Sequence, residues 1–373
     1  MKYLKNLKEY ISCISKVKEY RGYWVKLEHV IIILICGSLC GLTSLEEIHD
    51  YAKSTPARNM LRKIFGIYLI PSYTHFLRLL KMIDSSELNT VFIAWCNAII
   101  SDMHNKTISL DGKTVKSTAN MKEHKRSLHI VSAVLAEEKL TIGQLAVNSK
   151  SNEIPAVQEL IKLLDVKGTI ITADALNTQR NTAAIIVNRE ADYVLSVKEN
   201  HKQLYNKLAR KFNKAKTDMT VEQEKIETLE NSRGRVEKRV STVIHNIKWS
   251  KEKEEWKGLT AIGMIEKTNE INNQKETRYY LLSKNFTSKE LLNYTRNEWS
   301  VETMHWLLDV NLREDSSRIR DKNLQTTFNI IRKITLNTIQ RYKSKTDSKE
   351  SISKIMRNNL FDTINMENFL LNL

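Results

Sequence analysis

The stretch "TISLDGKTVKST", residues 107–118, contains the strand on which the predicted fold rests. A β-branched and apolar run over 107–110 predicts a strand that ends in an acid and a glycine, Asp111 and Gly112. The letters GKT match the end of the nucleotide-binding motif G-x-x-x-x-G-K-[ST], but Thr107 stands where the first glycine belongs, so a phosphate loop is excluded. Two interpretations stay open: a simple Asp-Gly turn, or a carboxylate held at the end of the strand for chemistry.

A second apolar strand also ends in a carboxylate. In "TIITADALNT", residues 169–178, Asp174 follows the apolar run. If the two strands are neighbours in one sheet, Asp111 and Asp174 converge at the edge where α/β sheets bind ligands. Close carboxylates repel and raise each other's pKa unless a cation lies between them. Because Mg²⁺ binds carboxylates together with water and phosphate oxygens, the pair predicts a metal site for phosphodiester chemistry.

A third acid is available in "YTRNEWSVETMHWLLDVNLRED", residues 294–315, which predicts a helix. At 100° per residue, four of its polar side chains fall within a sector of about 60°; they are Glu298, Glu302, His305 and Asp309. A solvated acidic stripe is the simpler interpretation. Trp299 and Trp306 argue against this interpretation, because large aromatic side chains are unfavourable beside a face that is only solvated.

The charge balance predicts a polyanionic partner. The 373 residues include 59 Lys and Arg against 43 Asp and Glu, a formal net charge of +16. Phosphates neutralised by Lys or Arg release condensed counterions, so we expect nucleic acid to bind; a basic protein without such a partner is the alternative.

The apolar run "VIIILICGSLCGL", residues 30–42, is too short for a membrane span and predicts a core helix. The first residues have no pattern of a secretion signal. The four cysteines lack the spacing of a zinc site and are expected to be buried thiols. We therefore expect a cytoplasmic protein that does not enter a membrane.

The order of elements predicts an α/β protein. Residues from about 5 to 100 have helical spacing, with a helix start at Pro71-Ser72. Three strands from 107 onward predict an antiparallel meander, followed by alternating helices and strands. A polar segment at about 200–257 predicts an insertion, before the strands "LTAIGMIEK" and "RYYLLSK". The expected domains are a helical one at 1–100, an α/β one at 101–345 and a helical C-terminal tail at 346–373.

Several motifs make the chain resemble the DDE transposases of bacterial insertion sequences, and specifically the H-repeat-associated, ISAs-type family. The motifs, spread over nearly the whole chain, are "PSYTHFLRLLKMID", "LDGKTVKST", "KSNEIPAVQELIKLLDVKGTIITADALNTQ", "ADYVLSVKENH", "GRVEKR" and "EWSVETMHWLLDVNLRED".

This resemblance implies an RNase H-like catalytic core with an insertion, in which the first and fourth strands lie side by side. It implies that the catalytic, metal-holding acids are Asp111, Asp174 and Glu302, with two Mg²⁺ ions that Mn²⁺ can replace. The implied chemistry is phosphoryl transfer without a covalent enzyme intermediate. Strand cleavage at the ends of the element would expose 3′-hydroxyls, which would then attack target DNA.

The chain departs from the family pattern at two places. Residues 233–235 read Arg-Gly-Arg where His-Gly-Arg is usual. The Tyr-Arg-Glu-Lys signature of related transposases is partly present as Tyr294 and Arg296, but Asp309 stands where the lysine belongs and Glu298 competes with Glu302. The third ligand is therefore the open choice among the acids.

The expected partner is double-stranded DNA, as element ends and as target, bound by a homodimer or higher oligomer. Phosphate contacts are predicted for five cations, namely Lys113, Lys116, Lys198, Lys202 and Arg296, although each alone is also an ordinary solvated cation. Base stacking is predicted for Trp299, while helix-core packing is favoured for Trp306. The region at 5–100 is expected to recognise DNA ends or to support assembly on them. Two alternatives stay open: a stand-alone nuclease, and a catalytically inactive or regulatory DNA-binding protein derived from a transposase.

Overall fold

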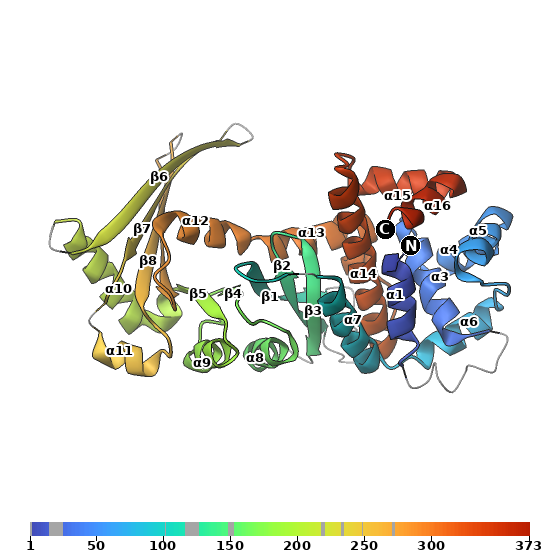
Figure 1. Ribbon diagram of the computed structural model, residues 1–373, viewed down its shortest axis with the longest axis horizontal. Coiled ribbons are helices and arrows are strands. Elements are labelled where there is room, and N and C mark those ends of the chain that lie inside the picture. The colour runs from blue at the N-terminus through green and yellow to red at the C-terminus, as the bar shows by residue number, and fades with distance from the viewer. Residues whose placement is uncertain are drawn as a thin grey trace.

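The computed structural model describes residues 2–14, 25–100, 102–115, 127–147, 153–217, 221–232, 235–247, 249–270 and 273–373. It is a mixed α/β structure with one large sheet and many helices, which confirms the predicted class (Figure 1). Lys116, Arg233 and Gly234 lie outside the described residues, so their predicted roles stay predictions.

The sheet has nine strands in the order β3-β2-β1-β4-β5-β9-β8-β7-β6. Their bounds are β1 Thr107–Val115, β2 Leu128–Leu135, β3 Leu140–Val147, β4 Ile170–Ala173, β5 Asp192–Val197, β6 Gln223–Ser232, β7 Arg235–Ile244, β8 Ala261–Asn269 and β9 Lys275–Leu282. The first three strands form the predicted antiparallel meander. Strand β4 lies parallel to β1 on one side and to β5 on the other, so the predicted neighbourhood of the first and fourth strands is confirmed.

Asp111 and Gly112 do not form a turn, and the prediction that the strand ends there is wrong. Strand β1 continues through both residues to Val115, because β2 is long enough to pair with it, with Gly112 opposite Val131. The glycine serves a close approach instead. A Cβ atom at position 112 would lie only 2.5 Å from a carboxylate oxygen of Glu153. No other residue type fits against this neighbour without displacing it.

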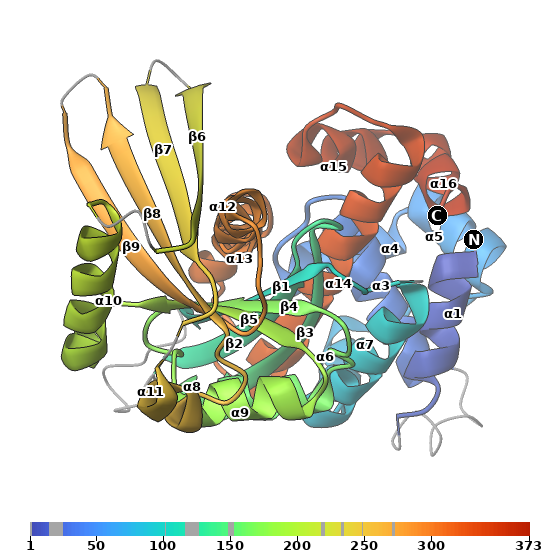
Figure 2. The ribbon, with the colours of Figure 1, turned by 60° about the vertical axis from the view of Figure 1, so that its left-hand side comes forward.

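The polar segment at about 200–257, which is predicted to be an insertion, contains strands that its composition does not reveal. It contains β6 and β7, two paired ten-residue strands that continue the sheet beyond β8 and β9. These strands project from the rest of the molecule, while α10, Lys202–Ala215, lies beside β9, and α11, Ser250–Glu255, lies near the base of the projecting strands (Figure 2). Because β6 is an outer strand with side chains partly exposed along its length, charged residues cover it and hide the strand signal.

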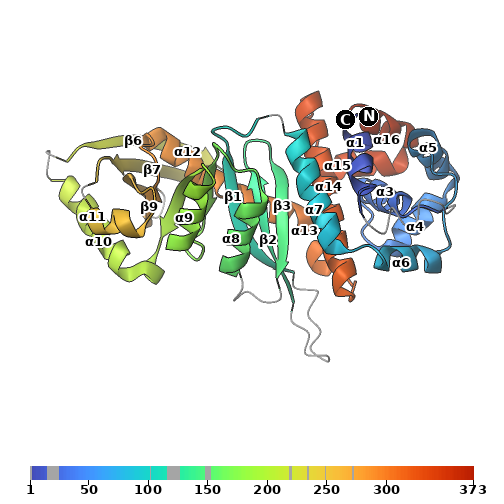
Figure 3. The ribbon, with the colours of Figure 1, turned by 60° about the horizontal axis from the view of Figure 1, so that its bottom comes forward.

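Helices cover both faces of the central strands. On one face lie α8, Glu153–Leu163, and α9, Arg180–Asn188; on the other lie α12, Ser288–Asn297, and α13, Ser300–Leu312 (Figure 1). The short helices η4, Glu199–His201, and η5, Glu314–Ser316, follow β5 and α13. Two helices, α7 at Ser85–Ile99 and α14 at Lys322–Thr346, cover the β3 edge and separate the sheet from the remaining helices (Figure 3).

Those remaining helices come from both ends of the chain. They are α1 Lys2–Ile11, α3 Leu27–Leu39, α4 Leu45–Lys53, α5 Thr55–Phe65, α6 Tyr73–Lys81, α15 Ile352–Phe361 and α16 Thr363–Leu371. The Asn359 side chain donates to the backbone oxygen of Leu39 at 3.2 Å, and Lys63 pairs with Glu367 at 2.5 Å. The C-terminal helices therefore pack on the N-terminal ones, while the domain limits themselves stay a prediction.

Two local predictions about this helical part are confirmed. All thirteen residues of α3 are buried, so the apolar run forms a core helix. Helix α6 begins where Ser72 accepts a hydrogen bond from the backbone N–H of His75. The prediction of four buried thiols is wrong for Cys13, which is exposed. Within the described part of the chain, no helix is long and apolar enough to cross a bilayer.

Candidate active site

The parallel register of β1 and β4 brings Asp111 and Asp174 to the same edge of the sheet. Leu110 pairs with Ala173, and each aspartate is the next residue along its own chain segment. Both side chains are half-buried. The convergence of Asp111 and Asp174 that the two strands predict is therefore present. Asp174 directly follows the end of β4, whereas Asp111 lies within β1, which continues to Val115.

The electrostatics of Asp111 reflect this convergence. Burial raises the pKa of its carboxyl to about 7, against a hydrogen bond from the backbone N–H of Gly112. Repulsion from Asp174, Glu153 and Glu302 adds to the rise. The acids are thus close enough to disfavour one another's charged forms.

The predicted single helix over 294–315 is wrong, because the chain breaks between α12 and α13. Glu298 caps the end of α12, whereas Glu302 lies in the first turn of α13. Glu298 still interacts electrostatically with Asp174, and Glu302 does so with Asp111 and Glu298. Burial raises the pKa of Glu298 to about 7, with Asp174 and Glu302 adding to the rise while Arg278 and Lys198 oppose it. We call Asp111, Asp174, Glu298 and Glu302 the carboxylate site.

The carboxylate site suits a divalent cation. Its donors are hard oxygen atoms, the kind that Mg²⁺ prefers. Burial first, and then repulsion between the acids, raises the pKa of Asp111 and of Glu298, so their charged forms are disfavoured. A divalent cation between them would remove this repulsion.

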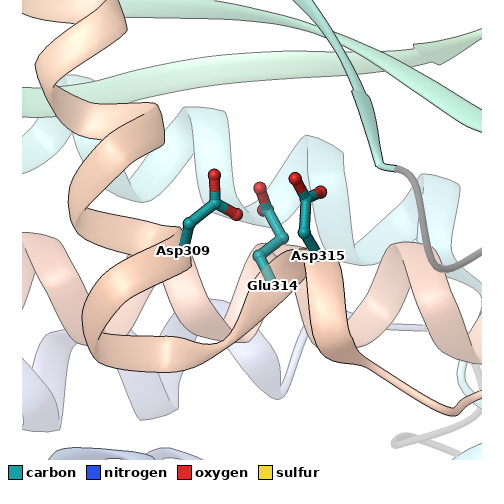
Figure 4. A group of neighbouring side chains, drawn as sticks. All are labelled: Asp309, Glu314 and Asp315. Carbon is teal, nitrogen blue, oxygen red and sulfur yellow. The ribbon is translucent and has the colours of Figure 1, made fainter.

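Asp309 lies apart from the carboxylate site. Lys113 Nζ lies 2.6 Å from a carboxylate oxygen of Asp309 and 2.7 Å from one of Glu314, and Asp315 lies 3.7 Å away. Figure 4 shows the three acids side by side at the end of α13. We call Asp309, Glu314 and Asp315 the lysine-filled cluster. Its cation is already supplied by Lys113, whose pKa these acids raise against the effect of burial.

This pairing also changes the interpretation of Lys113. The side chain is mostly buried and its ammonium is surrounded by carboxylates. It therefore offers no free charge to a DNA phosphate, and it is not among the phosphate-binding residues that we propose. Arg296 is likewise paired, with Glu230.

Three further predicted DNA contacts, Lys198, Lys202 and Trp299, are exposed. Lys198 and Lys202 follow β5 and reach solvent. Lys198 shares a cavity of about 420 Å³ with Arg278 and Glu298. Trp299 is 50% exposed and its ring lies 6.0 Å from the Arg278 guanidinium, a cation–π distance.

The predicted core packing of Trp306 is wrong. Its side chain is 59% exposed, because it lies on the face of α13 that points away from the sheet. His305 is on the buried side, with Nδ1 3.7 Å from Asp111 Oδ2. Burial first, and then nearby cations, lower the pKa of His305 to about 3, so its imidazole is neutral.

Three buried side chains beside the acids have no counterpart in the sequence prediction: His129, Glu153 and Asn177. Asn177 donates to Asp174 from both its backbone N–H and its side chain. One local signal was available, since a polar residue three positions after a strand-end acid can close a turn upon it. No local sequence signal predicts the contact between His129 and Glu153.

Comparison with known proteins identifies the family of this chain. The family model described as "Transposase DDE domain" matches residues 102–338, and the one described as "DDE_Tnp_1-associated" matches residues 8–96. The chain belongs to the DDE transposase family. This confirms the resemblance drawn from the motifs. Members of this family generally use divalent metals, which agrees with the donor set of the carboxylate site.

Two relatives match this DDE transposase over most of both chains. "H repeat-associated putative transposase YhhI" of Escherichia coli K12 is 31% identical over 353 residues, covering 90% of each chain. "Putative transposase YncI" of Escherichia coli O157:H7 is 30% identical over 347 residues, covering 90% of this chain and 88% of its own. A piggyBac transposase in a synaptic complex with hairpin DNA aligns with a TM-score of 0.48 and 15% identity, covering 99% of this chain and 81% of that one.

Proposed function

We propose that this DDE transposase cleaves DNA at the ends of an insertion sequence and joins the resulting 3′-hydroxyls to target DNA. The observation that carries the proposal is the meeting of Asp111, Asp174 and Glu302 at one edge of the sheet. The order β3-β2-β1-β4-β5, with β4 and β5 parallel to β1, supports the RNase H-like core that the resemblance implies.

We assign Asp111, Asp174 and Glu302 as the residues that would hold Mg²⁺ or Mn²⁺. When bound, two such ions supply positive charge at the attacking and leaving oxygens of the phosphoryl group. The chain itself positions the acids: the two strands hold the aspartates, and the first turn of α13 holds Glu302. Glu298 supports them from the end of α12, near Arg278.

DNA is the proposed partner, bound by a homodimer or higher oligomer in the cytoplasm of a bacterium, at the nucleoid. The carboxylate site repels phosphates, so cations near it must hold the backbone. Lys198 is exposed and shares a cavity with Glu298, and Lys202, four residues further along the chain, is also exposed; both suit that role. The helical region at 1–100 remains our candidate for recognising element ends.

The decisive experiment incubates the full chain with Mg²⁺, a duplex that carries the terminal repeat of its element, and a target plasmid. We expect cuts at the end of the repeat and covalent joining of that 3′ end to the plasmid. Equal cutting of unrelated duplexes without joined products would identify a nuclease instead. Binding without any cut would identify an inactive or regulatory protein.

The proposed phosphate-binding lysines have a separate test. The logarithm of DNA affinity falls as the logarithm of salt concentration rises. Replacing Lys198 and Lys202 by Gln should make this fall shallower, by about 0.9 in slope for each phosphate that is no longer neutralised. The matched control is Lys167→Gln. Lys167 is exposed, pairs with Glu190 and precedes β4, so it lies at the end of that strand away from Asp174. A slope equal to that of the control would remove both lysines from the DNA path.

A further inference from the structure

We propose that Glu153, His129 and Asn177 are positioning residues that hold the two aspartates of the carboxylate site in the arrangement that binds metal. This inference rests on the proposed function and assigns a role that the family match does not. The three side chains lie under the sheet, on the α8 side, opposite α13. We call these three side chains the buried relay, and the exposed Thr114 forms a hydrogen bond with its end.

The buried relay is a continuous line of hydrogen bonds. Thr114 Oγ1 lies 2.9 Å from His129 Nδ1, and His129 Nε2 lies 2.8 Å from Glu153 Oε2. On its other oxygen, Glu153 accepts from Asn177 Nδ2 at 2.9 Å. The line thus joins β1, β2, α8 and the turn after β4. Of these elements, β1 carries Asp111 and the turn after β4 carries Asp174.

Asn177 fixes one oxygen of Asp174. Oδ1 accepts from the Asn177 backbone N–H at 3.0 Å and from Nδ2 at 2.9 Å. Within the described parts of the chain, no protein donor contacts Oδ2. One oxygen is therefore held in place, and the other is left for a cation.

Glu153 lies directly against the backbone beside Asp111. Its oxygen Oε2 and His129 Nε2 would both come within 2.6 Å of a Cβ atom at Gly112. The glycine that follows Asp111 thus admits this pair under the strand. A displacement of Glu153 would therefore move the backbone of β1 at Gly112, the residue next to Asp111.

The burial of Glu153 is difficult to explain as a device for stability. Both Glu153 and His129 have side chains at most 3% exposed. A buried ion pair recovers its desolvation cost only with good geometry, and apolar residues of similar size are often as stable. Groups that hydrogen-bond a metal-ligating carboxylate orient it, and losing one weakens metal binding about 10 to 100-fold.

The test compares Asn177→Ala with Asn181→Ala in the full chain. Each asparagine donates its side-chain amide to a side chain of α8, Glu153 for Asn177 and Gln158 for Asn181, but only Asn177 touches the carboxylate site. Mn²⁺ alone is the probe, and its free concentration is measured by electron paramagnetic resonance. We expect about 10 to 100-fold weaker Mn²⁺ binding in Asn177→Ala and less than twofold change in Asn181→Ala.

Conservative variants separate positioning from folding. His129→Gln keeps a donor for Glu153 and should retain most Mn²⁺ affinity, whereas His129→Ala should lose it. Asn177→Ser, which keeps a short donor, replaces Asn177→Ala if the latter does not fold. Melting temperatures report the fold of each variant.

Three results are decisive. Mn²⁺ affinity at the level of Asn181→Ala in both Asn177 variants would overturn the proposal. Complete loss of Mn²⁺ binding in Glu153→Gln, equal to the loss in Asp111→Asn, would make Glu153 a ligand and also overturn it. Unchanged Mn²⁺ binding in Asp111→Asn itself would instead refute the metal site of the proposed function.

Discussion

Two groups of acids lie along α13, one near its start and one at its end, and they differ in how their charge is balanced. In the carboxylate site, burial and mutual repulsion raise the pKa of Asp111 to about 7. In the lysine-filled cluster, whose three acids are shown in Figure 4, the ammonium of Lys113 pairs with Asp309 and Glu314. Asp111 and Lys113 are two residues apart on β1, so one strand contributes an acid to the first group and a cation to the second.

The difference shows that close carboxylates alone do not indicate a metal site. The three acids of the lysine-filled cluster lie within 4.8 Å of one another, yet their charge is already compensated by the protein. Among the described residues, no lysine or arginine forms an ion pair with an acid of the carboxylate site, and the repulsion between these acids would be relieved by a cation from outside. The four predictions below test this comparison.

Asp111→Asn and Asp174→Asn should have the largest effect. Each removes one charged ligand, and losing several kcal/mol of charge stabilisation corresponds to about a thousandfold slower cleavage. Binding to the element's end, measured with Ca²⁺ in place of Mg²⁺, should stay near the wild-type level. Mg²⁺-dependent cleavage that survives either change would remove that residue from the site.

The third acid is tested by Glu302→Gln, Glu298→Gln and Asp309→Asn side by side. Glu302→Gln should reduce cleavage almost as severely as the aspartate variants, because a direct Mg²⁺ ligand lies about 2.1 Å from the ion. Glu298→Gln should cost about 10 to 100-fold, as expected for a supporting group. Asp309→Asn should leave Mn²⁺ affinity unchanged, since Asp309 binds Lys113. A mild Glu302→Gln beside an inactive Glu298→Gln would move the ligand to Glu298.

Lys113→Gln should convert the lysine-filled cluster into one that needs a cation. Leaving buried carboxylates unpaired costs about 3 to 5 kcal/mol of unfolding free energy, measured by urea denaturation. Added Ca²⁺ should raise the melting temperature of this variant more than that of the wild type. The control is Lys167→Gln, which breaks an exposed pair and should change stability by less than about 1 kcal/mol. If Lys113→Gln is as stable as Lys167→Gln, then repulsion among the three carboxylates does not destabilise the folded protein.

Lys333 provides the reverse case, a buried amine that forms no ion pair with an acid among the described residues. Its ammonium contacts Ser132 and Gln144, and burial lowers its pKa to about 7. Between pH 7 and about 10.4 the unfolded chain holds a proton that the folded protein has released, so stability should rise with pH.

Lys333→Met should reduce this rise by up to about 1.4 kcal/mol per pH unit, measured as unfolding free energy at several pH values. The slope is the informative quantity, because loss of the two hydrogen bonds shifts stability equally at every pH. Identical slopes in both proteins would show that Lys333 is charged in the folded state.

Much of this protein was readable in short stretches of sequence. An apolar run followed by an acid is a local pattern, and it located Asp111 and Asp174 before the sheet was known. The core helix α3 and the start of α6 at Ser72 were equally local, because burial on all sides and a capping hydroxyl leave a mark within a few residues. The motifs identified the family.

Other features were decided only by contacts between distant residues. Lys113 meets Asp309, 196 positions away, and this contact turns an expected DNA ligand into a structural cation. Strands β6 and β7 carry so many charges that only pairing with β8 and with each other reveals them. Trp306 is exposed because of the angle at which α13 packs on the sheet, which no periodicity specifies.

The sequence by itself determined which acids follow apolar runs, because hydrophobic patterning is local, whereas the neighbourhood of the first and fourth strands was implied by the family resemblance. Only the tertiary structure decided which acids remain without a cation, because charge balance depends on every group within a few ångströms in space. Asp111 and Asp309 look alike in the sequence. Lys113 distinguishes them, and it does so through the fold.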